Sequence, residues 1–443
     1  MNKELWIKEA KARGIEAVEI FEQKSSSTGI EVYEQKVDSF TISECDGIAL
    51  RGIYNGKMGI CYLEDASDEN MNYAMQQIIS NANSISSQDE VEIFAGEASY
   101  PKLHTRENTI RALDSEEKIA LLKKLEKAIL DSDSRIEQVM STSYSETEVT
   151  RSIQNSLGLS LEDKNSYSMF VAEVMAKEQD DVKSDFDWLI AYDKTDLDID
   201  AFAKQLSEKV CAKLNATQLP SGTYPVMIDA NTMNSLLGAL SGMFDGENAY
   251  KGISILKDSL GKQIFDEKIT IVDDSLLKDG YNTCAFDDEG VACRRKTVVA
   301  QGVLKTYLHN LKSAKLMKTQ STGNGFKGSY AGSVGISTTN FLIEEGSHSY
   351  EEMVESMEQG VIITEVNGLH AGLNSISTEF SLQSSGFYVE HGKIVKPINL
   401  ITVAGNFMDA MKHIRMVGND RKMSYTGIGC PSIMFESLAV SGE

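Results

Sequence analysis

Hydrophobic and polar residues alternate along much of the chain, which is the pattern of strands that bury one face. Residues 47–62 are the clearest case, because apolar side chains recur at alternate positions on both sides of Asn55-Gly56. This dipeptide accepts the positive φ angles of a type I′ turn, so the stretch predicts a β-hairpin. Residues 387–406 predict a second hairpin that turns at His391-Gly392.

Four segments of the first half have the 3.6-residue period of amphipathic helices instead. Residues 1–14 and 69–85 are the first two. A third follows Asp114, which together with Glu117 has the spacing of a capped helix start. The fourth carries apolar side chains four residues apart over residues 202–214. Stripes of this kind are typical of helices packed on a core.

Between the third and fourth helices lies a long Ser/Thr/Tyr-rich stretch with strand-like alternation. Residues 135–192 are therefore predicted to form antiparallel strands, with turns at residues 155–158 and 162–165. A break follows at residues 216–225, which hold two of the five prolines. The chain after this break is rich in glycine and in residues that favour strands.

These patterns predict an α+β fold, because strands that pair with their neighbours outnumber strand–helix–strand units. We expect an N-terminal α/β-type domain with antiparallel strands at residues 1–215, with a candidate sub-boundary near 99–113. A glycine-rich, mainly antiparallel β domain is expected at residues 216–443. A length of 443 residues fits two or three domains.

The composition argues against several classes of function and location. Acidic residues outnumber basic ones 66 to 43, and the formal charge of −23 argues against binding to nucleic acid or to an anionic membrane. Six cysteines occur without any C-x-x-C pair, and the charged N-terminus does not read as a secretory signal. No apolar run approaches the roughly 20 residues that span a bilayer. We expect a cytoplasmic protein with free thiols.

One short motif invites a nucleotide-binding interpretation. "GNGFKG", residues 323–328, fits the G-x-G-x-x-G pattern of dinucleotide sites. Such a site needs a buried strand before the glycines and a helix after them. A polar, basic stretch precedes this motif and a strand-like stretch follows it, so the glycines are expected to form a tight turn or to approach another backbone closely. The phosphate-binding motif G-x-x-x-x-G-K-[ST] is absent from the sequence.

Other catalytic signals in the sequence are weak. No G-x-S-x-G elbow occurs, and the six histidines are too far apart to form a helical zinc-binding pair. Cys430 before Pro431 is a candidate nucleophile, although a buried cysteine is the commoner case. Asp287, Asp288 and Glu289 could bind a cation or a peptide amine, or could form an acidic turn between strands. The residues alone therefore predict no readable active site.

Several stretches, in order over most of the chain, resemble one known family. They are "ALRGIYNGKMG", "AFDDEGVACRRKTVVAQGVLKTYLHNLKSAKL", "STGNG", "INLITVAGN", "VGND" and "GCPSIMFESLAVSG". The chain is similar to the TldD/PmbA family, which also carries the label modulator of DNA gyrase, and most closely to its PmbA (TldE) branch. The resemblance implies a cytoplasmic proteolytic system in which a TldD-type subunit carries zinc on an H-E-x-x-x-H helix, with a later cysteine as a further ligand.

The metal positions of that family can be placed on residues 231–252, which are expected to form the corresponding helix. With the Leu-Leu pair in register, the first histidine falls on Gly238 and the glutamate on Ala239. The second histidine falls on Met243, and the cysteine on Val417. Glycine, alanine and valine offer no side-chain donor, and methionine is a poor ligand for a hydrolytic zinc. The resemblance therefore implies no catalytic or metal site in this chain.

The expected role is that of a PmbA/TldE-like subunit acting with a zinc-bearing, TldD-like partner on unfolded peptides or small proteins. The resemblance places the Thr-Gly-Asn stretch beside the cleft, where a peptide strand would add by backbone hydrogen bonds. The candidate substrate-binding residues are Thr322, Gly323, Asn324, Gly325, Asp287, Asp288 and Glu289. The chain is expected to form a heterodimer, or a homodimer when alone. Two alternatives stay open: a self-sufficient peptidase with an unusual metal or cysteine site, and a non-proteolytic peptide-binding scaffold.

Overall fold

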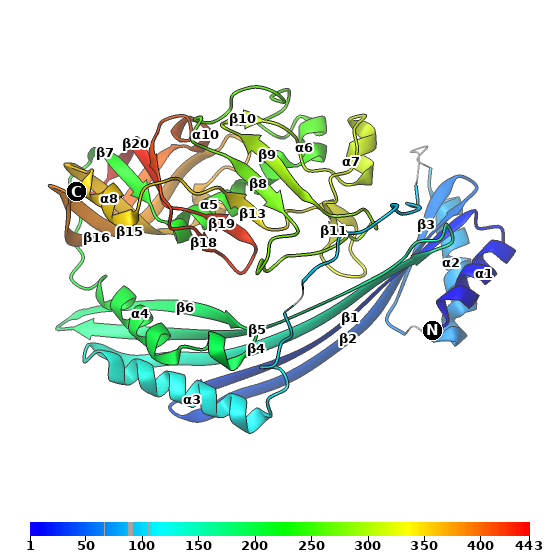
Figure 1. Ribbon diagram of the computed structural model, residues 1–443, viewed down its shortest axis with the longest axis horizontal. Helices are drawn as coiled ribbons and strands as arrows, with labels where there is room; N and C mark the ends of the chain where they lie inside the picture. The colour runs from blue at the N-terminus through cyan, green and yellow to red at the C-terminus, as the bar shows by residue number, and fades with distance from the viewer. Residues whose placement is uncertain (66, 87–91, 105) are drawn as a thin grey trace.

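A long curved sheet and a β-rich domain above its concave face make up the molecule (Figure 1). The computed structural model describes residues 1–65, 67–86, 92–104 and 106–443. The observed mixture of helices and mainly antiparallel sheets confirms the predicted α+β class. None of the described helices is long and apolar enough to cross a membrane.

The first half of the chain forms one six-stranded antiparallel sheet with the order β3-β2-β1-β4-β5-β6. Its strands are β1 (Ala17–Tyr33), β2 (Lys36–Tyr54), β3 (Lys57–Leu63), β4 (Ile136–Asn155), β5 (Ser160–Glu178) and β6 (Asp181–Ala191). The predicted β2–β3 hairpin is confirmed, with φ of 52° at Asn55 and 71° at Gly56. Strands from both sides of residues 99–113 belong to this same sheet.

The turn predicted at residues 162–165 is wrong. These four polar residues lie inside β5, which pairs with β4 from Ser160 to Ala176. The chain turns later, at Gln179-Asp180, where φ of Gln179 is 56°. Residues 162–165 are at least partly exposed, so a strand can hold four polar side chains in a row there without burying any of them.

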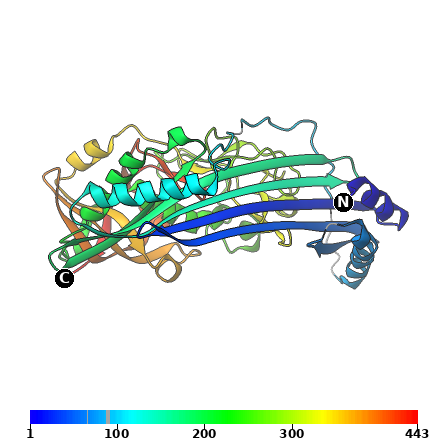
Figure 2. The same ribbon diagram turned by 90° about the horizontal axis from the view of Figure 1, so that it is seen from below.

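Helices cover the two ends of this sheet (Figure 2). They are α1 (Lys3–Ala12), α2 (Met71–Ser84), α3 (Ser115–Ser132) and α4 (Ile199–Cys211). The helices α1 and α2 pack on β1–β3, α3 packs on β4 and β1, and α4 packs on β5 and β6. The predicted start of α3 is confirmed: Asp114 accepts from the Glu117 N–H at 2.8 Å, and the two side chains form a capping box.

The second half of the chain forms two larger sheets around one hydrophobic core. Strand order is β10-β9-β8-β13-β19-β18 in one and β16-β15-β14-β7-β20-β17 in the other, where β16 also pairs with β20 and closes a ring. The strands are β7 (Gly222–Ile228), β8 (Ile271–Asp274), β9 (Arg295–Ala300), β10 (Val303–Leu304), β13 (Phe341–Ile343), β14 (Gln359–Asn367), β15 (Glu379–Glu390), β16 (Lys393–Asn406), β17 (Ile414–Val417), β18 (Lys422–Met423), β19 (Ile428–Cys430) and β20 (Ile433–Ser441).

Most pairings in these sheets are antiparallel, as predicted for this part of the chain. The pairs β7–β14 and β13–β19 are parallel. The hairpin of β15 and β16 turns at His391-Gly392 with φ of 51° and 72°, which confirms that prediction. Short elements complete the half: α5 (Ala230–Leu240), α6 (Gly246–Lys251), α7 (Leu311–Leu316), α8 (Tyr350–Glu355), α9 (Leu369–Gly372), α10 (Phe407–Ala410), and a hairpin of β11 (Gly325–Lys327) and β12 (Val334–Ile336).

The single helix expected over residues 231–252 is broken in the structure. The helix α5 ends at Leu240, a 3₁₀ turn, η3 (Ser241–Phe244), follows, and α6 begins after Asp245. Asp245 Oδ1 caps α6 by accepting from the Glu247 N–H at 2.6 Å. Because α5 ends at Leu240 and Met243 lies in η3, the positions equivalent to the family's metal ligands do not all lie on one helix.

Candidate functional site

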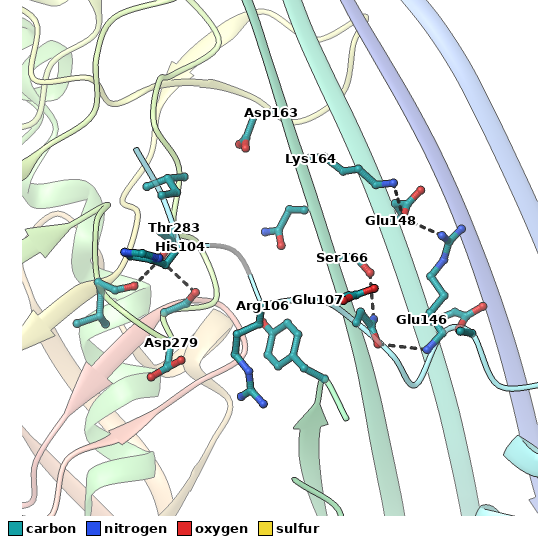
Figure 3. Close-up of a pocket in the computed structure, with 18 residues that line it drawn as sticks. His104, Arg106, Glu107, Glu146, Glu148, Asp163, Lys164, Ser166, Asp279 and Thr283 are labelled. Carbon is teal, nitrogen blue, oxygen red and sulfur yellow. Dashed lines mark hydrogen bonds and ion pairs between the residues drawn. The ribbon is translucent and has the colours of Figure 1, made fainter. Parts of the chain in front are cut away.

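A polar groove runs between the long sheet and the β-rich domain (Figure 3). It consists of three neighbouring cavities of about 550, 280 and 230 Å³. Asn165 and Thr283 line both the first and the second, Tyr167 and Asn282 line both the second and the third, and Tyr192 lines the first and the third. These shared walls make the three cavities parts of one cleft.

One wall of the groove contains a strand with an unpaired outer edge. Strand β6 pairs with β5 only from Ser168 onward, whereas β4 pairs with β5 from Ser160. The outer edge of residues 160–167 therefore lacks a neighbouring strand among the described elements, and residues 163–166 line the 550 Å³ cavity. An exposed strand edge presents N–H and C=O groups that can pair with an extended peptide.

Several charged side chains around the 550 Å³ cavity, whose lining is drawn in Figure 3, are held by partners within the chain. Glu148 accepts from Arg111 at 2.7 Å and lies 3.1 Å from Lys164 Nζ. Arg106 contacts Asp196 at 2.7 Å and lies over the Tyr192 ring, 4.7 Å from its centroid. These pairs fix the polar wall before any ligand binds.

The 230 Å³ end of the groove is aromatic. Four tyrosines line it, together with Met169, Ile190 and Asn282. Trp188 packs edge-on against two of them, with ring centroids 6.0 Å from Tyr281 and 5.9 Å from Tyr425. An apolar wall with polar hydroxyl groups suits a large side chain of a bound peptide.

The groove also leads toward the end of α5. A fourth cavity, of about 130 Å³, shares Ser337 and Thr338 with the 280 Å³ cavity. Its other walls include Ser241, Gly242 and Asp245, in the segment that follows α5. The cleft thus joins the inter-domain wall to the segment where relatives are expected to bind metal.

The four positions equivalent to the family's metal ligands and base do not fit a hydrolytic zinc. Gly238 is half-buried and Ala239 is exposed, and neither has a donor atom. Met243 and Val417 are buried in the same hydrophobic core. Zinc hydrolases hold the ion with nitrogen, oxygen or thiolate ligands, which these side chains do not supply. Within the described residues, no group of three or more His, Cys, Asp and Glu side chains is placed to hold a metal ion.

The structure brings together the two predicted substrate-binding segments, which are distant in sequence. The Gly325 N–H donates to Asp287 Oδ2 at 2.8 Å, and the Asp288 N–H donates to the Gly325 carbonyl oxygen at 2.8 Å. A Cβ atom at position 325 would lie 2.6 Å from Glu289 Oε2. Glycine at 325 therefore permits the two segments to approach, as the sequence predicted for this motif.

The carboxylates of the acidic segment are buried and already engaged. Asp288 forms an ion pair with Arg151 at 2.8 Å and accepts from the Lys327 N–H at 2.8 Å. Glu289 Oε2 accepts from the Leu311 N–H at 2.7 Å. The acidic turn considered from the sequence is present, but it faces the protein interior, and Arg151 links it to β4 and the groove wall.

The backbone N–H groups of the Thr-Gly-Asn stretch also donate hydrogen bonds within the chain. The N–H groups of Thr322 and Asn324 donate to the His309 carbonyl oxygen at 3.2 and 3.3 Å. The Gly323 N–H donates to Ser321 Oγ at 3.2 Å. A peptide strand could pair with these residues only by replacing hydrogen bonds that the chain already makes. Strand addition at residues 322–325 stays a prediction.

Burial also changes the protonation of the acidic segment. Burial first, and then the neighbouring Glu289 carboxylate, raise the pKa of Asp287 to about 8, against backbone N–H donors that favour the charged form. Burial raises the pKa of Glu289 too. Two carboxyl groups this close retain a proton at neutral pH.

We expect Asp287 to lower the free energy of unfolding as pH rises from about 4 to about 8, while buried His309, whose pKa is lowered from 6.5 to about 4, contributes the opposite slope below about pH 6.5. The folded protein keeps the Asp287 proton up to about pH 8, whereas the unfolded chain loses it near the ordinary pKa of 3.8. At Asp287 the folded state therefore binds more protons over this range, and the contribution of this group to stability decreases with pH. Chemical denaturation between pH 5 and pH 9 measures this slope, and the fall should be clearest from pH 6.5 to pH 8, above the range in which His309 opposes it.

The variant Glu289→Gln should make that slope shallower, because it removes the negative charge beside Asp287 and so lowers the Asp287 pKa. Glu44→Gln, at an exposed position of β2, is the matched control and should leave the slope unchanged. Equal slopes in the wild type and in Glu289→Gln would contradict the coupling of the two carboxyl groups.

Cys430, considered as a nucleophile, is fully buried in β19, and burial raises the pKa of its thiol. His309 is also buried, and burial lowers its pKa to about 4. Neither residue lines the groove cavities. A buried thiol with a raised pKa is a poor nucleophile, so the buried-cysteine reading of Cys430 fits the structure better.

Sequence reasoning missed the residues that line the groove. Thr147, Val149 and Arg151 on β4, with Asn165 and Tyr167 on β5, line the 280 Å³ cavity. They occupy alternate positions, so each set projects from one face of its strand. That alternation was visible in the sequence, but the domain that it faces was not.

Comparisons with family models and known proteins match most of the chain to a single family. Three family models match in order: PmbA/TldA metallopeptidase domain 1 at residues 18–84, the central domain at 108–214 and the C-terminal domain at 221–442. The chain is 29% identical to the metalloprotease PmbA of Escherichia coli O157:H7 over 329 residues, 74% of this chain and 70% of that protein. It is 30% identical to a metalloprotease TldD homolog of Buchnera aphidicola over 360 residues, 76% of this chain and 74% of that protein.

Solved structures are similar over nearly the full length. A putative modulator of a DNA gyrase from Thermotoga maritima is 31% identical, with a TM-score of 0.91 and 99% of both chains covered. TldE from Thermococcus kodakarensis has a TM-score of 0.91 at 21% identity, covering 99% of this chain and all of the other, which shows a shared fold. Family models over all three parts of the chain, supported by these relatives, show that it belongs to the PmbA/TldD family of metallopeptidase-related proteins.

Proposed function

We propose that this chain is the PmbA/TldE-type subunit of a TldD/PmbA-type metallopeptidase, and that it has no hydrolytic metal of its own. The observation that carries this proposal is the chemistry of Gly238, Ala239, Met243 and Val417 at the family's metal and base positions. A hydrolytic zinc needs about three donor side chains and a base for its water. These four side chains provide neither.

The zinc and the general base would come from a TldD-like partner that carries H-E-x-x-x-H. The two subunits would form a heterodimer in the cytoplasm, and the chain alone would form a homodimer. Its formal charge of −23 supports a peptide substrate over a nucleic acid, because phosphates would be repelled. Unfolded peptides and small proteins are the proposed substrates.

The groove is the proposed peptide-binding surface of this subunit. The unpaired edge of β5 at residues 160–167 can add an extended strand, and the aromatic end of the groove can take a large side chain. The segments 287–289 and 322–325 lie behind this wall and are proposed to hold its shape, with Arg151 as the link. Because the carboxylates of residues 287–289 are buried, a role in holding the groove wall suits them better than direct contact with a charged substrate.

Metal analysis and peptidase assays test the proposed role. The purified chain should contain far less than one zinc per molecule and should not cleave unfolded peptides, because the donors and the base are missing. The complex with the H-E-x-x-x-H subunit from the native host should cleave them, and a chelator should abolish the activity. Replacing the glutamate of that partner motif with glutamine should abolish cleavage while leaving the complex assembled.

Two results would favour the alternatives. Stoichiometric zinc with chelator-sensitive cleavage by this chain alone, or cleavage that a thiol-alkylating reagent abolishes, would indicate a self-sufficient peptidase. Capture of peptides without cleavage in any preparation, and no H-E-x-x-x-H protein bound to the chain in its native host, would indicate a scaffold.

A further inference from the structure

Two buried cysteines lie against each other beside the groove. Cys284 and Cys293 are 4% and 2% exposed, and their sulfur atoms are 3.6 Å apart. The Cys284 thiol donates to Cys293 Sγ, and the Cys293 thiol donates to the Gly323 carbonyl oxygen at 3.2 Å. The proposed function assigns no role to this pair.

Main-chain hydrogen bonds hold the two cysteines on the arms of one short loop. The Cys293 N–H donates to the Ala285 carbonyl oxygen at 2.9 Å, and the Asp287 N–H donates to the Val291 carbonyl oxygen at 2.9 Å. The thiols therefore cannot drift apart while the loop is folded. A disulfide requires the sulfur atoms to approach to about 2.05 Å, which is a movement of roughly 1.5 Å from their present separation.

A small oxidant can reach this pair from the groove, because Cys284 lines the 280 Å³ cavity. None of the other described cysteines combines a neighbouring sulfur atom with access from the groove. Cys61, Cys211 and Cys430 are buried, and Cys45 is exposed, but none has a second sulfur within hydrogen-bond distance in the described part of the chain. A second thiol in contact can resolve an oxidised cysteine as a disulfide. The hydrogen bond from Cys284 and burial raise the pKa of Cys293, so Cys284, at the cavity wall, is the sulfur that reacts first.

We propose that Cys284 and Cys293 form a reversible dithiol–disulfide site that responds to hydroperoxides. The Cys284 thiolate attacks one oxygen of the hydroperoxide; an S–O bond forms, the O–O bond breaks and an alcohol or water leaves. Cys293 sulfur then attacks Cys284 sulfur; the S–S bond forms and the S–O bond breaks, releasing water. Two thiols and one hydroperoxide thus give one disulfide, one alcohol and one water. Two equivalents of a small thiol reduce the disulfide by exchange, which restores both cysteine thiols and gives one small-molecule disulfide.

Oxidation of the two cysteines should change the hydrogen bonds of the Thr-Gly-Asn stretch, residues 322–324. The disulfide removes the Cys293 S–H donor, so the Gly323 carbonyl oxygen loses that hydrogen bond. It also closes a covalent ring around Asp287, whose carboxylate holds the Gly325 N–H. In a reducing cytoplasm the dithiol is the resting form, and the disulfide is the transient one.

The test uses the full reduced chain and hydrogen peroxide, followed by alkylation of free thiols in denaturant. Trypsin leaves both cysteines in one peptide, "DGYNTCAFDDEGVACR", residues 279–294. Oxidation should make this peptide lighter by two hydrogen atoms and resistant to alkylation. This conversion should be at least about tenfold faster than the oxidation of Cys61. Dithiothreitol should restore both thiols. Hydrogen exchange at residues 322–325 should increase in the oxidised protein.

Cys293→Ser and Cys284→Ser should each abolish the unalkylated peptide, while Cys211→Ser, at an equally buried site, should leave it unchanged. The peptide measurement on the wild type needs no variant, so a variant that fails to fold does not decide the outcome. Both thiols remaining alkylatable at a peroxide dose that modifies Cys45 would overturn the proposed site. A disulfide with unchanged exchange at residues 322–325 would overturn the coupling. Neither result depends on the proposed peptidase role.

Discussion

Replacing Asp273 with alanine is expected to lower the free energy of unfolding by about 3–5 kcal/mol, because the change leaves a buried lysine without its counter-charge. Asp273 is fully buried in the centre of a sheet, on β8. Its Oδ2 lies 2.9 Å from Lys296 Nζ and accepts from Asn324 Nδ2 at 2.8 Å. Its Oδ1 accepts from the Thr339 N–H at 2.7 Å and from Thr339 Oγ1 at 2.9 Å.

Each of these donors would lose the carboxylate in the variant, and Lys296 Nζ and Asn324 Nδ2 would keep only Asn324 Oδ1 and the Ser337 carbonyl oxygen as acceptors. The Lys296 side chain is only 9% exposed, so water cannot replace the carboxylate. Asn324 belongs to the Thr-Gly-Asn stretch, so the variant should also loosen the segment that we propose to hold the groove wall. Chemical denaturation measures the stability, and hydrogen exchange at residues 322–325 measures the loosening.

Two comparisons separate a buried ion pair from a general effect of charge removal. Asp409→Ala breaks an exposed pair with Lys412, whose side chains are 72% and 48% exposed, and should cost less than about 1 kcal/mol. The double variant Asp273→Ala, Lys296→Met removes both charges and should cost less than the sum of the two single changes. If the cost of the double variant equalled the sum of the two single costs, that result would contradict the ion pair between Asp273 and Lys296.

The elements that the sequence predicted well are those with a local signal. Asn55-Gly56 and His391-Gly392 provide the positive φ angles that their turns need, and the chain turns there. Asp114 and Glu117 form the capping box that their spacing indicates. Each of these interactions spans a few residues, so neighbouring side chains suffice to specify it. The same signal at Ser349 and Glu352, which start α8, was present but not used.

The failures arise where distant parts of the molecule decide the outcome. Residues 162–165 are polar enough to form a turn, yet they continue β5 because β4 pairs with them. Residues 231–252 look helical, yet α5 stops at Leu240 and Asp245 caps a new helix after a 3₁₀ turn. In both places a hydrogen-bonding partner outweighs the local composition.

The candidate site was predictable in its parts but not in its assembly. The sequence indicated that Gly325 would approach another backbone, and it singled out the segment 287–289. It did not indicate that the two segments bind each other, because 38 residues separate Asp287 from Gly325. Nor could it show that the acidic side chains face inward, since burial depends on the domain packed above them.

Replacing Gly386 with alanine should also be strongly destabilising, because its added methyl group would meet backbone and not a movable side chain. A Cβ atom at 386 would lie 1.9 Å from the Ile362 carbonyl oxygen and 3.1 Å from Ile363 Cα. Gly386 is buried in β15 opposite Ile363, where the β14–β15 register shifts around a bulge. Glycine at such a bulge allows one strand to approach the next closely.

Relief of this overlap requires β14 and β15 to separate, which weakens the ladder on both sides of the bulge. We expect a loss of about 3 kcal/mol, at the upper end of the usual cost of overpacking, measured by chemical denaturation. Gly328→Ala is the matched control: its added Cβ would meet no atom within 4 Å, so it should be neutral or slightly stabilising. If both variants unfolded at the wild-type denaturant concentration, β14 and β15 could not be in contact at Gly386. Parallel β7 pairs with the same stretch of β14, so a loss at 386 should also reach the strand that leads into α5 and the end of the groove.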